Sequence, residues 1–241
     1  MTCFTVLPTA EAVMLATADR FVATARESIE QRGTFRVALS GGGTPKQVYP
    51  LLLEPQRRDA VDWSRVEFFW GDERAVPPDH PESNFGVAYG MLISQVPGVR
   101  PDRVHRMRAE APDLDAAALS YESELRLAFD ARAGEPPAFD LVWLGMGYDG
   151  HTASLFPGSA ALGERERWAV GNWAPFQEAW RMTLTFPVLN AGRDVMFAVT
   201  GADKADALRE IRAGSSDLPA ARVDGAHVEW IIDSAAAGED T

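Results

Sequence analysis

The chain has 241 residues, of which 35 are acidic and 23 basic, so its net charge is −12 at pH 7. This charge repels nucleic acids and anionic lipid surfaces, which argues against nucleic-acid binding as a main function. The single cysteine, Cys3, cannot form an internal disulfide, and neither a signal peptide nor a membrane span is recognised, so the sequence predicts a cytoplasmic protein that does not bind membranes.

Helices and strands are expected to alternate along the chain. Apolar side chains spaced by three and four residues predict a helix that begins after Thr9 and ends at Gly33. The apolar run 35–39 predicts a strand, followed by a glycine-rich loop and a helix interrupted near Pro50. Further strands are expected at 66–70, 139–144, 182–186, 195–200 and 228–232, and helices at 83–95, 112–132 and 202–213.

This alternation is typical of an α/β fold with a doubly wound, mostly parallel sheet and helices on both faces. The expected architecture is therefore a Rossmann-like arrangement of three layers. No linker or internal repeat divides the sequence, so residues 1–241 are predicted to form one domain, with a frayed tail at 234–241. Ligands of such sheets bind beside the carboxyl ends of the strands, so a site is expected in the loops that follow them.

The first of these loops has three glycines between two hydroxyl side chains. Its residues are Ser40, Gly41, Gly42, Gly43 and Thr44. Glycines let backbone N–H groups approach an anion closely, and a helix N-terminus follows them. The loop is therefore predicted to bind phosphate, with a tight turn that binds nothing as the alternative. Its spacing does not match a Walker A loop.

The second loop places charged side chains after the strand at 66–70. Arg74 offers a planar fork of donors to phosphate or sugar oxygens, and Asp72 could act as a base or accept from a hydroxyl. An Asp-Glu-Arg triplet alone is more typical of a solvated turn, so this assignment depends on the neighbouring loops. Farther along, Ser83 and Asn84 are expected to cap the helix that starts there.

The third loop, at 145–154, contains the spacing Gly-x-Gly-x-x-Gly, which also occurs in dinucleotide-binding proteins. Its late position in the chain and the Pro157-Gly158 pair argue against a dinucleotide site. Asp149 comes two residues before His151, where a carboxylate could orient an imidazole for general-base catalysis. His151 is therefore a catalytic candidate, and a purely structural histidine is the alternative.

Two cations complete the set of candidates. Arg181 precedes the strand at 182–186, and Lys204 follows the strand at 195–200. The sheet topology can direct both at one anion, although each alone is more typical of a surface charge. Signatures of serine hydrolases and of zinc sites are absent from the sequence, so a metal is not implied.

Four ordered segments resemble the signature blocks of the 6-phosphogluconolactonases: ALSGGGTP, DWSRVEFFWGDERAVPPDHPESN, FDLVWLGMGYDGHTASLFPG and RMTLTFPVLNAGRDVMFAVTGADKADAL. The resemblance implies a sugar-isomerase-like fold and hydrolysis of a small sugar phosphate lactone, 6-phosphoglucono-1,5-lactone, without a cofactor. It also implies that His151 activates water beside Asp149 and Asp72. The positions that match the binding of phosphate and sugar are Ser40 to Thr44, Arg74, Arg181 and Lys204.

Three alternatives stay open: a glucosamine-6-phosphate deaminase of the same fold, a dinucleotide-dependent oxidoreductase, and a sugar-phosphate-sensing regulator. The last would need a DNA-binding module, which the negative charge disfavours. Phe156 stands where the deaminases carry a carboxylate, which favours the lactonase. Tyr148 stands where the lactonases commonly have an acidic residue, and the sequence does not predict its effect. The oligomeric state is also open, and a monomer is compatible with the sequence.

Overall fold

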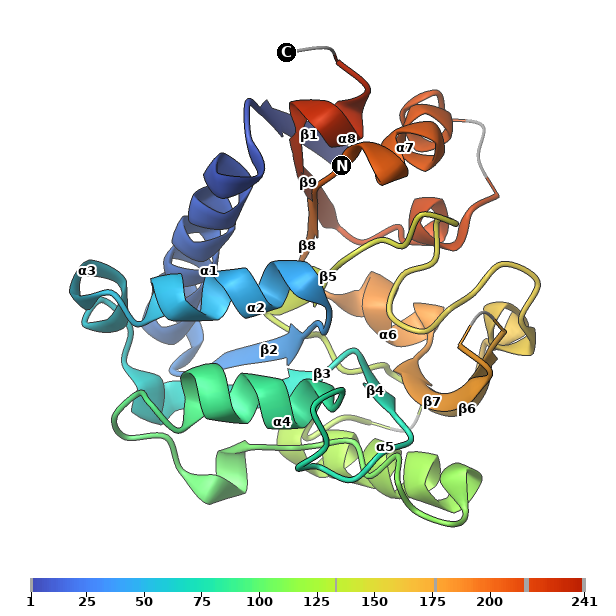
Figure 1. Ribbon diagram of the computed structural model, residues 1–241. Coiled ribbons are helices and arrows are strands. Elements are labelled where there is room, and N and C mark those ends of the chain that lie inside the picture. Colours follow the sequence, from blue (N-terminus) through green and yellow to red (C-terminus); the bar gives the residue numbers. More distant parts are fainter. Residues whose placement is uncertain (1, 133, 176, 215–216, 240–241) are drawn as a thin grey trace.

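A six-stranded parallel sheet forms the centre of the computed structural model, which describes residues 2–132, 134–175, 177–214 and 217–239 (Figure 1). Its strands, in spatial order, are β1 (Thr2–Leu7), β9 (His227–Asp233), β8 (Asp194–Val199), β5 (Leu141–Leu144), β2 (Phe35–Leu39) and β3 (Val66–Trp70). The inner strands β5 and β8 are nearly continuous apolar runs, as expected for parallel strands that are buried on both faces.

Helices cover both faces of this sheet, with α1 and α2 on one side and α6 and α7 on the other (Figure 1). The α-helices are α1 (Ala10–Arg32), α2 (Gly43–Leu52), α3 (Pro55–Arg58), α4 (Asn84–Ala88), α5 (Leu114–Phe129), α6 (Phe186–Ala191), α7 (Ala205–Arg212) and α8 (Ser234–Ala237). A π-helical turn, η2 (Tyr89–Ile93), continues α4, and 3-10 turns occur at η1 (Trp63–Arg65), η3 (Pro101–Arg103), η4 (Ala160–Gly163), η5 (Ala202–Lys204) and η6 (Pro219–Arg222). The doubly wound α/β fold predicted from the sequence is confirmed.

A second sheet, which was not predicted, has three antiparallel strands in the order β4 (Asp72–Arg74), β7 (Ala179–Leu184) and β6 (Ala169–Ala174). The chain leaves β3 through Gly71 and enters β4 at once, where Arg74 lies opposite Arg181. A strand composed of Asp, Glu and Arg has no apolar alternation, so the sequence pattern gives no signal for it. This sheet brings two segments that are far apart in the sequence to the same end of the molecule.

The long helix α1 has the limits that the sequence predicts. Its N-terminus is capped by Thr9 Oγ1, which accepts from the Ala12 N–H at 3.2 Å, and Gly33 ends it with φ 78. On its apolar side, Phe21 packs against the rings of Phe35 and Trp63. Neither α1 nor another helix in the described part of the chain is long and apolar enough to cross a membrane.

One sequence prediction about the helices is wrong. The helix α2 is not interrupted at Pro50 but continues to Leu52, because the buried Tyr49 and Leu52 hold its last turn against the core. Within the tail predicted at 234–241, the first residues form α8, whose start is capped by Asp233 Oδ1, which accepts from the Ala236 N–H at 2.8 Å. The last residues of that predicted tail, 240 and 241, lie outside the described part of the chain.

Candidate active site

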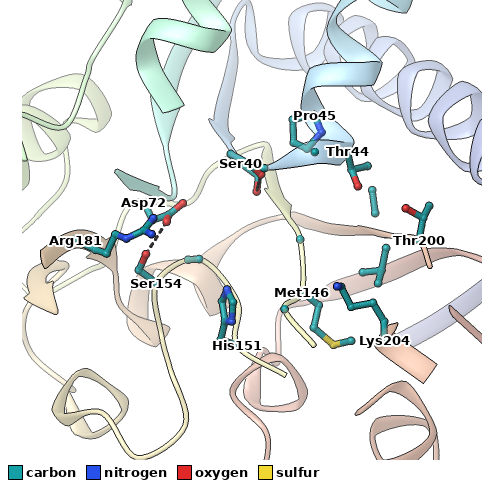
Figure 2. Close-up of a pocket in the computed structure, with 18 of the residues that line it drawn as sticks. Ser40, Thr44, Pro45, Asp72, Met146, His151, Ser154, Arg181, Thr200 and Lys204 are labelled. Carbon is teal, nitrogen blue, oxygen red and sulfur yellow. Dashed lines mark hydrogen bonds between the residues drawn. The ribbon is translucent and has the colours of Figure 1, made fainter. Parts of the chain in front are cut away.

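A cavity of about 380 Å³ opens beside the carboxyl ends of the parallel strands (Figure 2). Its walls come from the loops that follow β2, β3, β5 and β8, as expected for a sheet of this type, and from the second sheet. The sequence-predicted residues that line it are Ser40, Gly41, Gly42, Gly43, Thr44, Asp72, Arg74, His151, Arg181 and Lys204. The remaining candidate, Asp149, does not line the cavity but lies behind His151.

The glycine loop presents the N-terminus of α2 to the cavity. Gly42 has φ 99, a conformation that glycine adopts without strain, and α2 begins at the next residue. No side chain of the described residues caps this end of α2. The N–H groups of the first turn, which have no partner within a helix, therefore remain available to an anion, and Thr44 adds a hydroxyl at the same place.

Lys204 and Thr200 lie on the same side of the cavity as Thr44 (Figure 2). The Lys204 ammonium forms an ion pair with Asp203, whose side chain is largely exposed. An exposed ion pair contributes little, so an anion in the cavity can compete for the ammonium. The sequence analysis missed Thr200 because it placed this residue within the predicted strand 195–200, whereas β8 ends at Val199 and Thr200 directly follows it, as Ser40 follows β2.

Two guanidinium groups come from the second sheet. Arg74 and Arg181 are register partners across β4 and β7, and both line the cavity. Burial lowers the pKa of Arg181, with the charge of Arg74 acting in the same direction and that of Asp72 opposing it. The Arg181 Nε group is buried without a hydrogen-bond partner in the described residues. A buried Arg181 donor without a partner, next to the guanidinium of Arg74, indicates a binding place for an anionic or hydroxyl-rich ligand.

The carboxylate of Asp72 is held on both oxygens. Ser154 Oγ donates to Oδ2 at 2.6 Å, and Asn84 Nδ2 donates to Oδ1 at 3.1 Å. Arg181 lies beside this group in Figure 2. Because both oxygens already accept hydrogen bonds, Asp72 is better suited to balancing the guanidinium charges and accepting from a sugar hydroxyl than to removing a proton.

His151 faces the cavity, and its Nδ1 lies 2.5 Å from Asp149 Oδ1. This contact leaves Nε2 as the ring nitrogen available to a ligand. Burial of Asp149 opposes its ionisation, but hydrogen bonds from the ring and backbone of His151 and the charge of that ring together hold the Asp149 pKa below its usual range. The pair has the geometry of a base with an orienting carboxylate, as the sequence suggested.

The backbone around His151 leaves no spare room. A Cβ atom on Gly147 would lie 2.1 Å from His151 Nδ1, so the imidazole packs directly on the glycine backbone. On another side, the ring of Phe156 lies 4.6 Å from the imidazole, measured between centroids. Phe156 is buried and also lines the cavity, so the wall beside the imidazole is apolar.

The glycine spacing at 145–150 does not form a dinucleotide site. A dinucleotide fingerprint requires a helix directly after the glycines, whereas here bends and turns continue until η4 begins at Ala160. Tyr148 is more than half exposed and is not among the residues that line the cavity. Its departure from the lactonase pattern therefore leaves the cavity wall unchanged.

Known proteins of one family are similar to this chain. The family model of glucosamine-6-phosphate isomerases/6-phosphogluconolactonase matches residues 8–232. The chain is similar to a 6-phosphogluconolactonase of Synechocystis sp., with 44% identity over 192 residues, 79% of this chain and 77% of the relative. It is also similar to the structure of the 6-phosphogluconolactonase of Thermotoga maritima, with 31% identity, a TM-score of 0.84 and coverage of 97% and 100% of the two chains. A monomeric glucosamine-6-phosphate deaminase, 20% identical over 98% of each chain with a TM-score of 0.81, shares the fold.

Proposed function

The chain belongs to the family of glucosamine-6-phosphate isomerases and 6-phosphogluconolactonases, and we propose that it hydrolyses its lactone substrate with His151 as the base that activates water. It is a lactone hydrolase that converts 6-phospho-D-glucono-1,5-lactone into 6-phospho-D-gluconate in the oxidative pentose phosphate pathway. One observation carries the mechanism: an imidazole held by a partly buried carboxylate faces a cavity between cationic groups. The fold alone does not distinguish the reactions of this family, so the site has to do so.

The reaction needs one proton to be moved twice. Nε2 of His151 takes a proton from water while the oxygen of that water attacks the C1 carbonyl of the lactone. Backbone N–H groups or Arg74 stabilise the oxyanion. The imidazolium then returns the proton to the ring oxygen as the bond between C1 and that oxygen breaks. Asp149 stabilises the imidazolium between the two steps. No covalent bond between enzyme and substrate is required.

The phosphate of the substrate is assigned to the cations and N–H groups that line the cavity. Lys204 supplies a positive charge, and the N-terminus of α2 supplies backbone N–H donors. Arg181 supplies a buried Nε donor that has no hydrogen-bond partner in the described residues. These groups bind the phosphate in the ground state and in the transition state alike, so they contribute to affinity more than to turnover. A cytoplasmic location, expected from the sequence, is part of this proposal.

Removal of a phosphate-binding cation should therefore raise KM. Lys204→Ala and Arg181→Ala are each expected to raise KM for the phosphorylated lactone by about 10-fold or more, because a charge-assisted hydrogen bond contributes about 1.5–3 kcal/mol. Steady-state kinetics with gluconolactone, which has no phosphate, should show a much smaller change. Lys46→Ala is the matched control, since Lys46 is the other lysine of the chain and does not line the cavity. Equal losses with both substrates would contradict the assignment.

The same cavity should not deaminate glucosamine 6-phosphate. Ring opening followed by proton transfer between C1 and C2 needs an acid and a base in sequence, and a carboxylate beside the histidine assists that chemistry. Phe156 occupies this place with an apolar ring 4.6 Å from the imidazole. An ammonia-release assay is expected to stay at background at enzyme concentrations that hydrolyse the lactone rapidly. Deamination at a comparable turnover would favour the deaminase instead.

A further inference from the structure

Asn84 connects two side chains of the cavity without lining the cavity itself. It is the first residue of α4, and only 3% of it is exposed. Its Nδ2 donates to the Asp72 carbonyl at 2.8 Å and to Asp72 Oδ1 at 3.1 Å. Its Oδ1 accepts from Arg74 Nη1. One carboxamide thus holds both a carboxylate and a guanidinium that face the substrate.

The position of Asn84 is fixed from behind by a buried carboxylate. Glu73 Oε1 accepts from the Asn84 N–H at 2.7 Å, and Oε2 accepts from the Phe85 N–H at 2.8 Å and from Ser83 Oγ at 3.0 Å. These bonds satisfy N–H groups that the start of a helix leaves without a partner. Ser83 also caps α4 by accepting from the Gly86 N–H at 3.0 Å. The carboxamide is therefore attached to a rigid element.

The glycine loop packs against the same carboxamide. A Cβ atom on Gly41 would lie 1.8 Å from Asn84 Oδ1. Only glycine at position 41 therefore leaves room for this carboxamide beside the loop backbone. Two segments that border the cavity, the glycine loop and β4, therefore meet the helix α4 at Asn84. A shift of this side chain would disturb all three.

We propose that Asn84 is a positioning residue for lactone hydrolysis, whose carboxamide aims the Asp72 carboxylate and the Arg74 guanidinium at the substrate. The inference rests on the proposed function and names a residue that acts through these two. A carboxamide suits this place because it donates and accepts at once. Asp72 needs a donor and Arg74 needs an acceptor. An ionised carboxylate at position 84 would only accept, and an apolar side chain would do neither.

The first test removes the carboxamide. Asn84→Ala is expected to lower kcat/KM for the lactone by about 10- to 100-fold. The reason is that Asp72 and Arg74 would lose their fixed orientation, and the loss of such positioning lowers catalytic efficiency by about this factor. Ser83→Ala is the matched control, because Ser83 is the buried neighbour at the same helix start and its hydroxyl bonds to Glu73 and to the Gly86 N–H rather than to Asp72 or Arg74. It should lower the melting temperature while retaining near-native kinetics. The same kinetic loss in Ser83→Ala would show that any disturbance of the start of α4 lowers activity, without a specific role of the Asn84 carboxamide. That result would overturn the proposal.

The second test exchanges the carboxamide for a carboxyl group of the same shape. The protonated carboxyl of Asn84→Asp can still donate to Asp72 and accept from Arg74, whereas the ionised form repels Asp72. The ionisable groups around this place come from β4, from β7, from α2 and from the turn before α4: Asp72, Glu73, Arg74, Arg181, Tyr49 and Glu82. The ratio of variant to wild-type kcat/KM should therefore be highest at acidic pH and fall as the pH rises.

This ratio, measured from about pH 5.5 to 8 on variants that melt cooperatively, separates orientation from packing. A falling ratio supports the proposal, because packing alone has no reason to change with protonation. A constant ratio, or an Asn84→Ala variant with kcat/KM within about twofold of the wild type, would overturn it. The wild type in the same assay tests the proposed function separately: absence of lactone hydrolysis there would count against the function, whereas normal kinetics of the Asn84 variants would count against the positioning role alone.

Discussion

Replacement of His151 by glutamine is expected to lower kcat for the lactone by about 10²- to 10⁴-fold, the usual contribution of a positioned general base. Glutamine retains a polar group near the cavity but cannot take a proton from water. The loss should appear in kcat with little change in KM, because the cations that we propose to bind the phosphate are untouched. The measurement is proton release from fresh lactone, corrected for spontaneous hydrolysis, with a chelator present.

The pH profile gives the same test a second readout. For the wild type, kcat/KM should rise from mildly acidic to neutral pH, because only the neutral ring accepts a proton. The pKa of Asp149 is held below its usual range, so this carboxylate is already ionised throughout that interval and adds no second limb. In His151→Gln, the rising limb should disappear. Near-native turnover of this variant, or a flat wild-type profile, would remove His151 from the mechanism.

Much of the site could be predicted because its residues follow strands. Ser40, Asp72 and Lys204 come within a few residues of the ends of β2, β3 and β8, three strands of the parallel sheet. The carboxyl ends of such strands meet at one edge, so residues far apart in the sequence converge there. His151 follows β5 in the same way. The apolar strand runs and their order therefore carried most of the prediction.

The second sheet could not be predicted, and it brings Arg74 and Arg181 together. Its strand β4 pairs with β7, which lies far along the chain, and β4 consists of three charged residues. The pattern that identifies a strand is apolar alternation, which is absent from β4. The sequence placed Arg181 at a strand start, whereas it lies within β7 as a register partner of Arg74.

Asn84 was missed for a different reason: the Ser-Asn pair at 83–84 is fully explained as a helix start, which hides the second role of the Asn84 side chain. Ser83 followed by Asn84 predicts a helix start, and Ser83 is indeed the N-cap of α4. The contacts of the Asn84 side chain with Asp72 and Arg74 depend on how β4 is oriented against α4, which no local pattern encodes. The same holds for Ser154, whose bond to Asp72 joins the third loop to the second.

Substitution of Gly147 by alanine is expected to lower kcat by about 10²-fold while the protein stays folded, since a small displacement of a catalytic group can cost this much. Its Cβ would lie 2.1 Å from His151 Nδ1 and 2.7 Å from Asp149 Oδ1, so the imidazole must move away from its carboxylate. The backbone itself is not strained, because Gly147 is not among the residues with positive φ. The variant therefore retains the base and disturbs its position.

Gly163→Ala is the matched control for this substitution. A Cβ there would meet nothing within 4 Å, Gly163 has no positive φ, and it does not line the cavity. It should keep native kinetics and a native melting temperature. If Gly147→Ala also kept native turnover, the imidazole would tolerate displacement from Asp149, and the pair could not be the unit that activates water. If its loss equals that of His151→Gln, with cooperative melting retained, then the contact at Nδ1 is what makes His151 an effective base.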